Sequence, residues 1–106
     1  MKRAILLALL VMGFNGFLNP ALSMDWNRLD GTTKEFKAAY FSGAYDGYRT
    51  MRFLKEANEI FCMPDGVTNM QLAAVAEKYI VNNPEKWNHV AAYEAFIAWK
   101  EAWPCK

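Results

Sequence analysis

The chain has 106 residues, with 12 lysines and arginines against 11 aspartates and glutamates, and a net charge of +1. This near-neutral balance gives no electrostatic basis for binding nucleic acid or an anionic membrane surface. A chain of this length forms one domain, and the hydrophobic core of so small a domain is only marginally sufficient for stability.

The N-terminal residues have the three-part layout of a secretory signal peptide. Lys2 and Arg3 form a basic start, the apolar run 4–14 follows, and small residues precede a predicted cleavage point after Ser23. The run is too short for a transmembrane helix, which needs roughly 20 residues. An uncleaved amphipathic anchor is the alternative. We therefore expect an exported protein with a single helical domain at residues 24–106.

The first long helix is predicted from a capping box. Residues 24–31 are polar and lack periodicity, which indicates a lead-in segment. Thr32 is then the expected N-cap and Glu35 its reciprocal partner. The helix should run from about Thr33 to Ile60 and end before a turn at the sequence MPDG.

Two further helices follow in the same way. A second capping box at 68–71 opens a helix that should end near Val81. Asn83 is expected to cap a third helix that has Pro84 at its first position and ends near Trp103. Three helices with short connections favour an all-α, up-down-up bundle.

The two cysteines, Cys62 and Cys105, follow the expected ends of the first and third helices. An up-down-up bundle places those two ends together, and in an exported chain such a pair predicts a disulfide. Closing a loop of this length constrains the unfolded chain by about 4 kcal/mol. A structural zinc ion has four ligands, and one histidine with two cysteines does not make up a usual ligand set. We expect neither a metal nor another cofactor.

The first helix has two apolar faces. Ala39, Gly43 and Gly47 form a small-residue ridge that another helix could approach closely. The opposite face combines aromatic residues with arginine, a composition typical of interface hot spots. The alternative is a central helix that is covered on both faces. The predicted partner-binding residues are Phe41, Tyr45, Tyr48 and Arg52, with Trp87 and His89 before the third helix.

The third helix is expected to bury one broad apolar arc and to expose Glu94, Ala98 and Glu101. The arc comprises Val90, Ala92, Tyr93, Phe96, Ile97, Trp99 and Trp103. His89 falls on this arc and is interpreted as a partly buried, hydrogen-bonded residue.

We expect no catalytic residue. Ser42 lies inside a predicted helix without a nucleophile motif, both cysteines are used in the bridge, and the sequence has no glycine-rich phosphate loop. The sequence therefore predicts a binding protein and not an enzyme.

Together the motifs resemble the Rap/Tai family of periplasmic type VI secretion immunity proteins. The matching residues are Gly47-Tyr48, Cys62, Pro64, Val67-Thr68, Gln71, Val75, Lys78-Tyr79-Ile80, Pro84-Glu85 and Trp103-Pro104-Cys105. The match spans about residues 43–106. The sequence departs from many relatives at Tyr45, where they carry a further cysteine.

The resemblance implies an all-helical periplasmic inhibitor, often dimeric, that blocks the cleft of a peptidoglycan amidase toxin. It does not name the toxin. Two other classes stay open, a small periplasmic acid-stress chaperone and a structural envelope protein. The scattered carboxylates and the single histidine argue against an acid-driven switch.

Overall fold

The computed structural model describes residues 24–106, and the predicted signal peptide lies outside them. The described chain is all-α, as expected, apart from one isolated β-bridge between Asp25 and Val90. Its elements are α2 (Trp26–Leu29), α3 (Lys34–Phe53), α4 (Asn69–Val81), the 3₁₀ helix η1 (Pro84–Lys86) and α5 (Ala91–Ala102).

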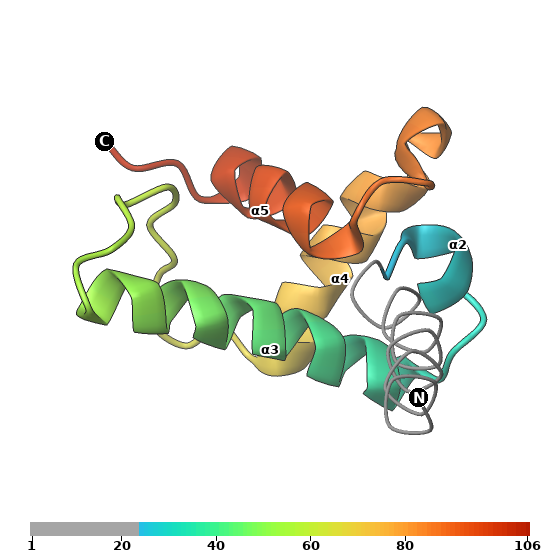
Figure 1. Ribbon diagram of the computed structural model, residues 1–106, viewed down its shortest axis with the longest axis horizontal. Coiled ribbons are helices and arrows are strands. Elements are labelled where there is room, and N and C mark those ends of the chain that lie inside the picture. The colour runs from blue at the N-terminus through green and yellow to red at the C-terminus, as the bar shows by residue number, and fades with distance from the viewer. Residues whose placement is uncertain (1–23) are drawn as a thin grey trace, which may run out of the picture.

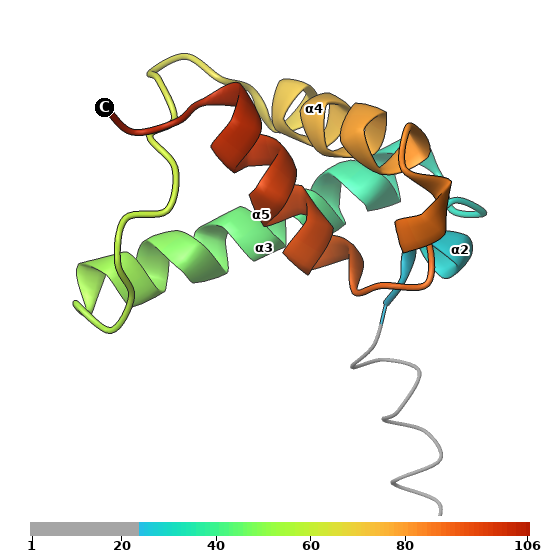
Figure 2. The same cartoon turned by 90° about the horizontal axis from the view of Figure 1, so that it is seen from above.

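The three main helices alternate in direction along the chain (Figure 1). Helix α4 packs against both α3 and α5, and Figure 2 shows α5 lying obliquely across α3. The C-terminal segment lies beside the long loop that joins α3 to α4, in both views.

The expected lead-in contains a short helix that contributes to the core, so that interpretation was wrong. Asp25 caps α2 by accepting a hydrogen bond from the Arg28 N–H, and Trp26 and Leu29 are fully buried. The segment also pairs with the chain before α5, where the Ala91 N–H donates to a carbonyl in the lead-in. Two apolar residues three positions apart were too short a pattern to reveal this helix.

Helix α3 begins one residue later than predicted. The N-cap is Thr33, whose hydroxyl accepts from the Phe36 N–H, whereas the Thr32 hydroxyl donates to the Leu29 carbonyl. The predicted capping box with Glu35 is therefore not formed. Thr32 is used instead to close the end of α2.

Helix α3 also ends at Phe53, seven residues before the predicted Ile60. Lys55 adopts a left-handed backbone with φ of 60°, its N–H donates to the Arg52 carbonyl, and the Glu56 N–H donates to Met51. These bonds form a Schellman motif, which usually has glycine at the left-handed position. Because lysine occupies it here, at a cost of about 1–2 kcal/mol, the sequence carried no stop signal.

Helix α4 is confirmed at both ends, with the Thr68 hydroxyl accepting from the Gln71 N–H. The predicted third helix is divided. Pro84 opens only the short η1, and α5 starts at Ala91. The intervening chain is used for pairing with the N-terminal segment, because the Asn27 N–H donates to the Trp87 carbonyl.

The core contains an aromatic cluster centred on Phe61, a loop residue that is 3 % exposed. Its ring lies 4.4 Å from Tyr48, 5.6 Å from Trp99 and 5.8 Å from Phe96, measured between centroids. The Trp99 indole N–H donates to the Leu72 carbonyl, so this buried donor is satisfied. The cluster joins α3, α5 and the loop between α3 and α4.

The predicted apolar arc of the third helix is confirmed at Trp99, which is fully buried, and wrong at other positions. Glu94 and Ala98, expected in solvent, are buried, while Tyr93 and Val90 are exposed. The true inner face consists of Ala91, Glu94, Ala95, Ala98 and Trp99. The small alanines allow α4 to approach closely, and aromatic content alone did not identify this face.

The predicted disulfide between Cys62 and Cys105 is confirmed, with Cα atoms 4.9 Å apart. We expected this bridge to join the ends of two helices, and that expectation was wrong for Cys62. Cys62 lies nine residues beyond α3, in a loop that returns toward the C-terminal segment.

Candidate partner-binding surface

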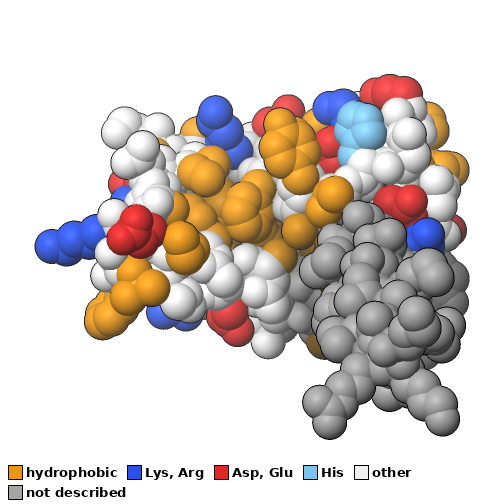
Figure 3. Space-filling model, in the orientation of Figure 1, with side chains coloured by type: hydrophobic (Ala, Val, Ile, Leu, Met, Phe, Trp, Pro, Cys, Tyr) orange, Lys and Arg blue, Asp and Glu red, His pale blue; other side chains and the backbone are white. Residues whose placement is uncertain are grey.

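A shallow groove of about 590 Å³ runs between α3, the loop after it and α5. Its floor and walls are apolar almost throughout, and Figure 3 shows apolar side chains gathered over α3 and α5 on this face. Its lining residues are Ala44, Gly47, Tyr48, Thr50, Met51, Ala57, Ile60, Ala92 and Phe96. We call it the α3–α5 groove.

Of the predicted small-residue ridge on α3, only Gly47 lines the groove. A Cβ atom added to Gly43 or Gly47 would meet no heavy atom within 4 Å outside the local helix. The predicted packing of another helix against this ridge is therefore wrong. Met51 and Ile60, at 44 % and 38 % exposed, leave the groove open to solvent.

The residues of the predicted aromatic and arginine face of α3 differ in their burial. Phe41 is fully buried and Tyr48 is 8 % exposed, so neither offers much area to a partner. Both belong to the core. The alternative of a helix covered on both faces is nevertheless wrong, because Gly43 and Gly47 on the other face are exposed. Tyr45 is half-buried and Arg52 is exposed. A partner-binding role for these residues stays a prediction.

Tyr45, Tyr48 and Arg52 do meet in one cleft of about 390 Å³, on the other side of Tyr48 from the groove. Arg52 reaches Glu59 at 3.8 Å, and the Arg49 guanidinium lies 5.8 Å from the Tyr45 ring centroid. The Tyr48 hydroxyl accepts a hydrogen bond from the backbone N–H of Ile60, which fixes the loop between the groove and the cleft.

Trp87 and His89 lie at a different corner of the molecule, beside η1. The Trp87 indole N–H donates to the Ile80 carbonyl at 2.7 Å, so this side chain secures the end of α4. His89 is exposed, so its predicted partial burial was wrong. Its Nδ1 lies 2.9 Å from a carboxylate oxygen of Glu94, which confirms the predicted hydrogen bond. The other Glu94 oxygen lies 3.8 Å from Lys86 Nζ.

Two groups near these elements have shifted pKa values. Burial raises the pKa of the Tyr40 hydroxyl, opposed by the hydrogen bond that it accepts from the Ala92 N–H. The pKa of Lys86 is also raised, chiefly because its ammonium donates to the Tyr79 hydroxyl at 2.7 Å. Both shifts move the pKa further above neutral pH, so both groups keep their protons there.

The serine and the two cysteines that were considered for catalysis have structural positions. Ser42 Oγ is buried within α3, away from solvent, and both sulfurs are in the disulfide. Within residues 24–106, no helix is long and apolar enough to cross a membrane.

These features define the class as a small, disulfide-linked helical protein with an apolar groove and a neighbouring cleft that carries charged residues. The chain belongs to the family of Rap1a immunity proteins, whose model matches residues 15–105. That match confirms the resemblance seen in the sequence, and the family is one of immunity proteins, not of enzymes. No curated protein and no solved structure matched the chain.

The groove residues that sequence reasoning missed came from three segments. Ala57 and Ile60 were assigned to a helix, and Ala92 and Phe96 to a core-facing arc. Gly47 and Met51 were placed on one face correctly, but that face was assigned to packing within the domain. The available signal was an apolar helical face rich in small residues, which fits an internal or an external contact equally well.

Proposed function

We propose that the protein is exported to the periplasm, where it binds and inhibits a peptidoglycan amidase toxin delivered by type VI secretion. Membership in the Rap1a immunity protein family is the observation that carries this proposal. The export step rests on residues 1–23, which have the pattern of a cleaved signal peptide.

The α3–α5 groove is the surface that we assign to the toxin. Exposed, contiguous apolar surface on a small protein is typical of an interaction site. Here the groove is bounded by the helical backbone at Gly47 and by the loop residue Ile60, which is held by Tyr48. Arg52, Arg49 and Glu59 supply charge beside it, as in the polar rim of an interface.

Inhibition by this surface needs no chemistry from the inhibitor. A rigid domain loses little conformational entropy on docking, so more of the contact energy becomes affinity. The disulfide and the buried Phe61 hold the loop that forms one wall of the groove. We propose that the wall stays in place while the groove covers the amidase cleft.

Binding to a panel of purified type VI effectors, made up of several peptidoglycan amidases and members of other enzymatic classes, tests the function. We expect one amidase to bind in the nanomolar range and to lose hydrolysis of peptidoglycan at stoichiometric inhibitor. If no amidase is bound but an effector of another enzymatic class is bound and inhibited, the amidase assignment is wrong and the immunity role stands. If no effector is bound, the immunity role itself is wrong.

The groove is tested by a pair of matched variants, Met51→Glu and Met70→Glu. Both methionines are on helices and are about equally exposed, at 44 % and 41 %, but only Met51 lines the groove. A charge at position 51 must be desolvated on docking, so we expect toxin affinity to fall at least about a hundredfold. Met70→Glu should bind as the parent does.

Affinity measured by calorimetry, with sedimentation of each variant alone, separates the outcomes. Equal affinity of both variants would exclude the groove as the toxin site. Loss of self-association by Met51→Glu, with unchanged toxin affinity, would instead make the groove a contact between two copies of the chain.

A further inference from the structure

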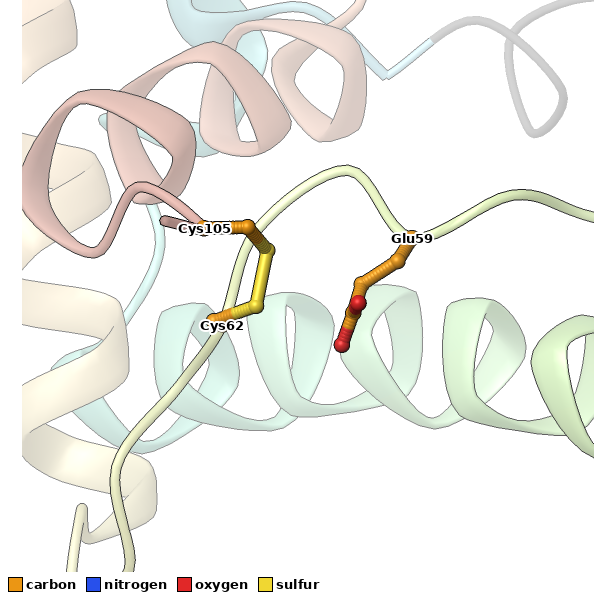
Figure 4. Close-up of side chains that lie close together, drawn as sticks. All are labelled: Glu59, Cys62 and Cys105. Atoms are coloured by element: carbon orange, nitrogen blue, oxygen red, sulfur yellow. A yellow bond between two sulfur atoms is a disulfide. The ribbon is translucent and has the colours of Figure 1, made fainter.

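Glu59 lies beside the disulfide, in the loop between α3 and α4. One carboxylate oxygen and the sulfurs of Cys62 and Cys105 all lie within 4.8 Å of one another (Figure 4). All three residues are exposed. Figure 4 shows the Glu59 side chain extending alongside the bridge from a neighbouring part of the loop.

The positions of the two cysteines do not depend only on the bond between their sulfurs. The Cys62 N–H donates to the Trp103 carbonyl at 2.8 Å, which joins the loop to the C-terminal segment. Phe61, next to Cys62, is buried in the aromatic core, and Trp103 is packed against that core. The two cysteine backbones are therefore also held as neighbours by contacts that do not involve their sulfurs.

We propose that Glu59, Cys62 and Cys105 form a binding site for a zinc-class divalent cation when the disulfide is reduced. A dithiol reductant supplies two electrons and two protons, is itself oxidised to a disulfide, and leaves two cysteine thiols. The cation then displaces both thiol protons into solvent and is held by two thiolates and one carboxylate. Water takes the fourth position of a tetrahedral set.

The charges favour this arrangement only with the cation present. Two thiolates and a carboxylate would place three negative charges within 4.8 Å, and a divalent cation removes most of that repulsion. Arg52 lies 3.8 Å from one Glu59 oxygen at the surface. That weak, solvent-screened pair is a small competitor for the carboxylate.

The proposed site differs from the expectation, drawn from the sequence, that the chain binds no metal. The sequence count of one histidine and two cysteines excluded zinc, because it did not include a carboxylate brought close by the loop. The oxidised protein still offers no thiolate ligand. The cation would act as a replacement cross-link between the loop and the C-terminal segment.

The test uses the purified protein reduced with a trialkylphosphine, which is oxidised to the phosphine oxide and leaves no competing thiol. Anaerobic titration with Co²⁺ should give thiolate-to-metal charge-transfer absorption with tetrahedral d–d bands, reversed by Zn²⁺. The oxidised protein should give neither. Zn²⁺ should raise the melting temperature of the reduced protein, or restore its helical circular dichroism if reduction unfolds it.

Glu59→Gln and Glu56→Gln are the matched variants, since both acids are exposed residues of the same loop. Glu59→Gln should weaken Co²⁺ binding about tenfold or more, and Glu56→Gln should not change it. Equal affinity of both variants would remove the carboxylate from the site. Absence of thiolate charge transfer in the reduced parent would overturn the proposal altogether.

Discussion

Phe61 is the residue that fixes the long loop to the helices. Its ring lies within 6.1 Å of the Tyr45, Tyr48, Phe96 and Trp99 rings, and the residue is 3 % exposed. Aromatic pairs of this kind add to the free energy gained by burying their area. The buried Phe61 ring thus holds in place the loop after α3, which forms one wall of the groove.

We expect Phe61→Ala to lower the free energy of unfolding by about 3–5 kcal/mol, because it leaves a cavity in the core. Phe53→Ala is the control, since Phe53 is 86 % exposed and surface truncations stay within about 0.5 kcal/mol. Urea denaturation followed by circular dichroism measures both. Similar midpoints for the two variants would show that Phe61 is not a core residue.

Tyr40 makes the stability of the folded protein depend on pH in the alkaline range. Burial raises the pKa of its hydroxyl above the usual value near 10, so the folded state keeps the proton at pH values where the unfolded state loses it. This contribution is complete below about pH 10 and is lost as pH rises through the folded pKa. The raised pKa of Lys86 acts in the same direction.

The free energy of unfolding should therefore fall above about pH 10, and Tyr40→Phe should fall less steeply. The variant also loses the hydrogen bond to Ala92, so its stability at pH 7 should be lower by about 1 kcal/mol. Tyr93→Phe, at an exposed position of α5, is the control. Parallel pH profiles for parent and Tyr40→Phe would contradict this account.

At the scale of elements, α3 carries both the core face and the groove face. Phe41 and Tyr48 face inward, while Gly43, Gly47 and Met51 are exposed. The 3.6-residue period correctly separated these two faces in the sequence. It could not say which face the domain would cover, because both are apolar.

Gly47→Ala tests the exposure of that face. Alanine is favoured over glycine inside a helix by about 1 kcal/mol, and the added methyl group meets no heavy atom within 4 Å. We expect the melting temperature to rise, with Gly43→Ala behaving in the same way. A destabilised Gly47→Ala variant would mean that another element packs on the ridge after all.

At the scale of the whole molecule, the disulfide closes the loop between residues 62 and 105, which contains α4, η1 and α5. The bridge also restrains the returning loop against the C-terminal segment. In so small a domain, its contribution is comparable to the entire net stability.

The double variant Cys62→Ser/Cys105→Ser should lose about 4 kcal/mol in the free energy of unfolding, from the 43-residue separation. For a domain of this size, that corresponds to a fall in melting temperature of more than about 15 °C. Calorimetry in the presence of a metal chelator measures it. A melting temperature equal to the parent's would show that the bridge does not constrain the unfolded chain.

The sequence by itself determined the all-α class, the bounds of α4, the cysteine pair and the family resemblance. These depend on local signals: the Thr68 cap is read within four residues, and two cysteines have one possible internal pairing. The motifs that matched the family are likewise short and ordered along the chain.

Only the tertiary structure decided where α3 ends, which face of α5 is buried and what forms the groove. Lys55 adopts a left-handed conformation at the point where the chain turns back, and the segment after it leads to the buried Phe61 and to the disulfide. Glu94 is buried, and His89 and Lys86 lie near its carboxylate. Such outcomes depend on residues far apart along the chain, or on contacts that local propensity does not encode.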